Sequence, residues 1–168
     1  MAHLLVDQLR FARRELIRCL DGVSDEEARQ RFVPMNCMSW MVGHLATQEH
    51  YYWVIAAQGK VVAPDLYAQV GFGQPASSPD FEEMWTTWRE ITAAADVYLD
   101  TLTPEMMTTT LEYEGKKLRE DIGTMLLRNI YHIWFHIGEA HAVRQQLGHT
   151  DLPQFVGQML PEAGYRPE

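Results

Sequence analysis

The sequence His132-Ile-Trp-Phe-His136-Ile-Gly-Glu139 combines a helical hydrophobic pattern with two histidines one turn apart. At about 100° per residue, His136 lies roughly 40° from His132 around a helix axis, and Glu139 lies about 20° from it. Two imidazoles placed in this way can reach a single ion, as in the zinc helices that carry the HExxH pattern. The sequence therefore favours a helix that supplies two metal ligands, with a third ligand from another part of the chain.

The segment around these histidines, residues 119–147, is helical throughout in its pattern, and Gly148 is placed to end it in the left-handed conformation. Three more segments have helical character and cover residues 3–20, 39–59 and 79–102. The last of them begins at Ser78-Pro79, a typical cap and first position. The connection over residues 59–79 is long and without periodicity. Four long helices with one long connection between the second and third predict an all-α four-helix bundle.

Two smaller elements are predicted between the long helices. Ser24 and Glu27 have the spacing of a capping box, which predicts a short helix over residues 25–31. Threonines and alternating apolar residues predict a small hairpin or an extended loop over residues 108–118. Both elements would connect helices rather than carry chemistry.

Composition limits the classes to which the chain can belong. Its length of 168 residues favours a single domain spanning residues 1–168, and 46% hydrophobic residues suffice to bury a core. Acidic residues outnumber basic ones 23 to 14, which argues against nucleic-acid binding and against anionic membranes. With no apolar leader, no transmembrane run and only two cysteines, we expect a cytoplasmic protein with reduced thiols.

The second helix offers two candidates for the third metal ligand. His44 and His50 are six residues apart, or about 120° around a helix, so only one of them can face the ion. Gly43 would let another helix approach beside His44, which makes His44 the better candidate. Two further histidines are expected at the surface: His141 and His149. The alternative interpretation is that each histidine is an ordinary buried, hydrogen-bonded helix residue.

Tryptophans, methionines and cysteines are expected in the core. The residues that share one buried side of the third helix are Trp85, Trp88, Ile91 and Ala95. Cys19 and Cys37 have no neighbours that would activate a thiolate, which predicts buried structural cysteines. A third interpretation is a structural protein in which the tryptophan-rich helix forms the apolar face of a homodimer.

Three motifs occur in order along the chain. They are Ser39-Trp-Met-Val-Gly-His44-Leu-Ala, the His132 and His136 pair followed by Ile-Gly-Glu, and Gln145-Gln-Leu-Gly-His. Together they resemble the DinB-like (YfiT-like) metalloenzyme superfamily over residues 7–149. The resemblance implies an up-down-down-up four-helix bundle in which His44, His132 and His136 bind one divalent ion, zinc or nickel.

The chain also departs from the pattern of the superfamily. Many members continue the second histidine of the pair with Arg-Gly-Gln, whereas Ile137-Gly-Glu139 stands here. If the missing arginine holds an anionic substrate in those members, the resemblance implies a different substrate for this chain. Glu139 would then act as an acceptor that orients an imidazole. The maleylpyruvate isomerase branch has glutamate at the position of His132, which argues against an isomerase.

The three-histidine set points to catalysis because three neutral imidazoles on one ion leave positions open for a thiol, a water or a substrate oxygen. Members of the superfamily include mycothiol- and bacillithiol-dependent transferases, so the resemblance implies a low-molecular-weight thiol cosubstrate and a small-molecule substrate. Metal-dependent hydrolysis needs the same parts. A non-catalytic metal- or ligand-binding helical bundle is the other alternative. The expected pocket neighbours are Gln48, Tyr51 and Asn129.

Overall fold

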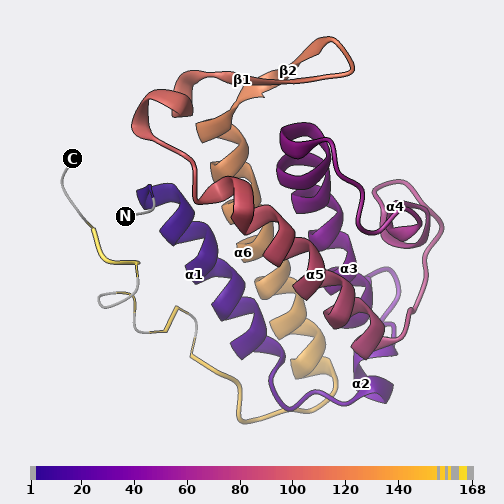
Figure 1. Ribbon diagram of the computed structural model, residues 1–168. Helices are drawn as coiled ribbons and strands as arrows, with labels where there is room; N and C mark the ends of the chain where they lie inside the picture. The colour runs from indigo at the N-terminus through magenta and orange to yellow at the C-terminus, as the bar shows by residue number, and fades with distance from the viewer. Residues whose placement is uncertain (1–2, 155, 158, 160–162, 166–168) are drawn as a thin grey trace.

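The computed structural model describes residues 3–154, 156–157, 159 and 163–165 (Figure 1). The long helices are α1 (Leu4–Leu20), α3 (Met38–Glu49) with the π-helix η1 (His50–Ala56), α5 (Phe81–Leu99) and α6 (Ile122–Gln146). The shorter elements are α2 (Asp25–Arg29), α4 (Leu66–Val70), the 3-10 helix η2 (Pro104–Thr108) and the strands β1 (Thr110–Tyr113) and β2 (Lys116–Asp121). The described part of the chain is therefore mostly helical, as predicted.

The long helices lie side by side in Figure 1, with α1 packed on α6, α6 on α3, and α3 on α5. Strands β1 and β2 pair antiparallel and confirm the predicted hairpin, which projects from one end of α6. Gly115 in the hairpin turn has a φ of 73°, a conformation that glycine adopts without strain. No helix in the described ranges has the length and apolarity needed to cross a lipid bilayer.

Two long helices begin later than the sequence predicts. Helix α6 starts at Ile122 instead of residue 119, because residues 116–121 form β2 and the Asp121 side chain accepts the Thr124 amide. Helix α5 starts at Phe81, so the predicted cap Ser78 and first position Pro79 are wrong. Asp80 is the cap, and its carboxylate accepts the Glu83 N–H at 2.8 Å. In both places the helix begins after an aspartate that caps it, and not at the start predicted upstream.

The second long helix is not uniform. It is helical through Gln58, close to the predicted end at residue 59, but α3 gives way at His50 to the π-helix η1. The wider π turn is typical of functional regions, and here it places Trp53 fully inside the core. Gly43 of α3 allows close approach, as predicted: a Cβ there would lie 2.4 Å from the sulfur of Met84 on α5.

The core contains the residues expected in it. The four residues predicted to share one side of α5 are all buried, and so are Cys19 and Cys37. Trp85 and Trp88 are only 8% and 4% exposed, because α5 packs this face against the rest of the chain. They do not form an exposed apolar face, and a homodimer that uses α5 stays a prediction.

A buried ion-pair network joins three of the helices. The guanidinium of Arg13 on α1 donates to both carboxylate oxygens of Glu49 on α3 and, at 2.8 Å, to Asp96 on α5. Burial opposes the charge of Arg13, but the two carboxylates outweigh burial and raise the pKa of Arg13 above its ordinary value. Sequence analysis did not predict this network, because its three members are widely separated along the chain.

Candidate metal centre

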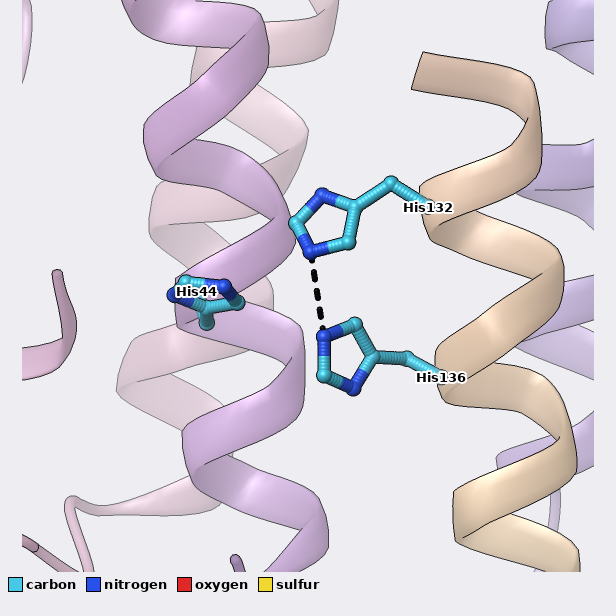
Figure 2. A group of neighbouring side chains, drawn as sticks. All are labelled: His44, His132 and His136. Atoms are coloured by element: carbon cyan, nitrogen blue, oxygen red, sulfur yellow. Dashed lines mark hydrogen bonds between the residues drawn. The ribbon is translucent and has the colours of Figure 1, made fainter. Parts of the chain in front are cut away.

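Three histidines from two helices converge in the space between α3 and α6 (Figure 2). His44 projects from α3, and His132 and His136 project from α6 toward it. One ring nitrogen of each lies within 4.8 Å of the others, and the Nε2 atoms of His132 and His136 are 3.1 Å apart. The prediction that these three side chains come together is confirmed; that they bind a metal remains a prediction.

Two of the imidazoles are fixed by acceptors at Nδ1. His44 donates from Nδ1 to the carbonyl oxygen of Val70 at 2.9 Å, and His136 donates from Nδ1 to Glu139 Oε2 at 2.8 Å. A carbonyl oxygen and a carboxylate can only accept, so each Nδ1 carries the proton and each Nε2 presents a lone pair. The predicted role of Glu139 as an acceptor that orients an imidazole is confirmed.

The third imidazole is fixed through a chain of amide groups. His132 Nδ1 donates to Gln48 Oε1 at 3.1 Å, and the same oxygen accepts from Asn129 Nδ2. The Asn129 oxygen in turn accepts the indole N–H of Trp53, which sets the orientation of the amide. Each donor in this chain faces an acceptor, so His132 also keeps its proton on Nδ1 and presents Nε2.

The arrangement of donors fits a divalent cation. With both protons on Nδ1, the 3.1 Å contact between the Nε2 atoms of His132 and His136 brings two lone pairs together, which is unfavourable without a cation. Two nitrogens bonded to one zinc ion at about 2.0–2.1 Å lie about 3.3 Å apart at the tetrahedral angle. The histidine pair is already close to this separation, and the His44 nitrogen would need to approach by up to about 1.5 Å.

Burial favours the neutral form of His44 and His132. Burial, aided by the nearby His136, His44 and Arg128, lowers the pKa of His132 to about 3. Burial also lowers the pKa of His44, whose ring stacks on Trp40 with ring centroids 4.2 Å apart. Neutral imidazole is the form that binds a metal ion, so His44 and His132 are suited to that role near neutral pH.

A cavity of about 960 Å³ opens beside the histidines. His44 and His132 form part of its wall, together with Gln48 and Tyr51, which confirms both as pocket neighbours. Asn129, predicted as a third neighbour, is buried behind Gln48 and does not line the cavity. The volume is within the range of small-molecule sites.

The other candidate histidines do not join the group. His50 is buried and accepts the Val62 amide at Nε2, so His44 and not His50 lies with the His132 and His136 pair. His141 and His149, both expected at the surface, are half-buried. His149 is close to Arg144 and Glu27, at the far end of α6 from the hairpin.

Sequence reasoning missed the carbonyl of Val70 and the partner Trp53. The Val70 carbonyl comes from α4, in the connection without periodicity, and a backbone group has no signature in the sequence. Trp53 lies in the π-helix and donates to Asn129, whereas its chain position alone indicates an ordinary core residue.

A mostly helical protein with three imidazoles converging at the wall of a cavity has the features of a metal-dependent enzyme of the DinB/YfiT-like class. The family model Mycothiol-S-transferase matches residues 4–148, and the chain belongs to this family, within the DinB/YfiT-like superfamily. A search of curated proteins found no match.

Proposed function

We propose that this protein is a divalent-metal-dependent transferase that moves a low-molecular-weight thiol to an electrophilic small molecule. The family name suggests mycothiol as the thiol. The observation that carries the proposal is the convergence of three Nδ1-anchored imidazoles beside a cavity large enough for a small molecule. The proposed ligands are His44, His132 and His136, and the proposed ion is zinc or nickel.

The ion, when bound, would lower the pKa of a thiol and favour its nucleophilic thiolate form. The protein side chains have supporting roles. Glu139, Gln48 and the Val70 carbonyl hold the three rings so that every Nε2 is free to bind. Such partners matter because they fix both the tautomer and the orientation of a ligand. Burial of His44 and His136 excludes water from one side of the group, while the half-buried His132 lies next to the cavity.

We further propose that the four long helical segments form an up-down-down-up bundle of the DinB type, in one domain spanning residues 1–168. The packing of α1 on α6, α6 on α3 and α3 on α5 supports this arrangement. A cytoplasmic location and a homodimer remain predictions, and sedimentation of the purified protein tests the second.

A transfer assay tests the proposed reaction. Mycothiol and 1-chloro-2,4-dinitrobenzene are mixed with the metal-loaded protein, and the thioether is followed by absorbance. We expect the His132→Ala variant to lose about a hundredfold or more of the rate, because the group that activates the thiol is lost. His141→Ala is a matched control on the same helix, outside the histidine group, and should keep the rate. Equal rates for wild type and a folded His132→Ala protein would contradict the proposal.

A further inference from the structure

The cavity beside the histidines has an aromatic wall. Six aromatic side chains line it: Tyr51, Tyr52, Tyr67, Phe72, Tyr131 and Phe135. They come from η1, from the connection between α3 and α5, and from α6, so they surround the opening from several sides. Aromatic side chains on three separate segments offer several ring faces and edges to one bound molecule.

Several of these side chains face solvent. Phe72 is 84% exposed, Phe135 69% and Tyr131 65%. Leu127, Tyr131 and Phe135 follow one another at four-residue steps on α6, so they form one exposed stripe along the edge of the cavity. Exposed apolar groups that gather in one place mark a ligand groove or an interface more often than a neutral surface.

The cavity offers little to a charged molecule. Its lining contains no carboxylate, and its one arginine, Arg128, is paired with both carboxylate oxygens of Glu120 on β2. An anion would have to compete with Glu120 for the guanidinium, and with the thiolate for the ion that His44 and His132 would hold. A cation would find no acidic group in the lining. Because charged groups are costly to remove from water without a partner, the lining favours a neutral ligand.

We propose that this cavity binds the electrophilic substrate and that this substrate is an uncharged molecule with an aromatic ring. The inference rests on the proposed thiol transfer. In the transfer, the sulfur of the low-molecular-weight thiol attacks the electrophilic carbon and a carbon–sulfur bond forms. The bond to the leaving group breaks and the leaving group departs with its electron pair, while the thiol proton passes to water.

Binding of unreactive rings tests the cavity without the reaction. Titration calorimetry of the metal-loaded protein in saturating mycothiol compares 3,5-dinitrobenzamide with 3,5-dinitrobenzoate, which differ mainly in charge. We expect the amide to bind about tenfold more tightly or better. Phe135→Ala should lower the affinity for the amide about fivefold, because one ring contact is lost. Val97→Ala, at an exposed apolar residue on α5, is the matched control and should not change binding.

A second variant tests the charge argument. Glu120→Gln frees the guanidinium of Arg128, so the benzoate should gain about tenfold in affinity while the amide changes little. Benzoate binding as tight as amide binding in the wild type would overturn the inference. The inference would also be overturned if neither ring bound and sedimentation showed a dimer that Phe135→Ala dissociates. The aromatic edge would then be an interface between copies of the chain.

Reactive versions of the two rings separate this inference from the proposed function. With mycothiol, 4-chloro-3,5-dinitrobenzamide should be converted with a kcat/KM about tenfold above that of the benzoate, after each rate is divided by its uncatalysed rate. Transfer without a preference for the amide would overturn the inference and keep the proposed function. Tight binding of the amide with no transfer to either ring would overturn the proposed function and support the preference for a neutral ring.

Discussion

Removing the carboxylate of Glu139 should weaken metal binding without unfolding the protein. Glu139 Oε2 accepts the Nδ1–H of His136 at 2.8 Å, and the Glu139 side chain is 20% exposed. A hydrogen bond to a charged group contributes about 1.5–3 kcal/mol, which corresponds to about 10- to 100-fold in a dissociation constant. Removal of such partners weakens metal binding over the same range. Because water can replace part of the lost bond, we expect Glu139→Ala to bind the metal about tenfold to thirtyfold more weakly than the wild type.

The assay is competition for zinc or nickel against a chelator of known affinity, with unfolding followed by circular dichroism. Glu139→Gln keeps an acceptor oxygen but no charge and should lie between the wild type and Glu139→Ala. Glu90→Ala removes an exposed acid from α5 and controls for the change in net charge. Metal affinity in Glu139→Ala equal to that of the wild type would refute the role assigned to this carboxylate.

Three further perturbations test other parts of the structure. Asn129→Leu breaks the amide chain behind His132, and we expect about tenfold weaker metal binding by the same competition assay; unchanged affinity would show that the chain does not hold the ring. Arg13→Met leaves the Glu49 carboxylate buried without its main partner, which should lower the free energy of unfolding in urea by about 3–5 kcal/mol and leave metal affinity unchanged. Gly43→Ala places a Cβ against Met84, so we expect a loss of about 1–3 kcal/mol in the same urea assay, and a stability equal to wild type would contradict the close approach of the helices.

Much of the site could be predicted from spacing along single helices. The rotation of about 100° per residue around a helix axis places His132, His136 and Glu139 on one face of α6. The same rotation separates His44 from His50 on the second helix. The resemblance to the superfamily then joined His44 to the pair. These predictions succeeded because helical geometry depends on neighbouring residues, which the sequence lists directly.

The parts that failed depend on contacts between distant segments or on competition at helix ends. Asp80 rather than Ser78 begins α5, because its carboxylate reaches the Glu83 amide. The π-helix contains the fully buried Trp53, and no local pattern of the sequence indicates its wider turn.

The central claim is that the three histidines hold one divalent ion. The most direct measurement is elemental analysis of the protein, made without a polyhistidine tag and dialysed against a weak chelator, beside the His132→Ala variant at the same concentration. We predict about one zinc or nickel ion per chain in the wild type and almost none in the variant. A folded, helical wild type that keeps no metal, or a variant that keeps as much as the wild type, would contradict the claim.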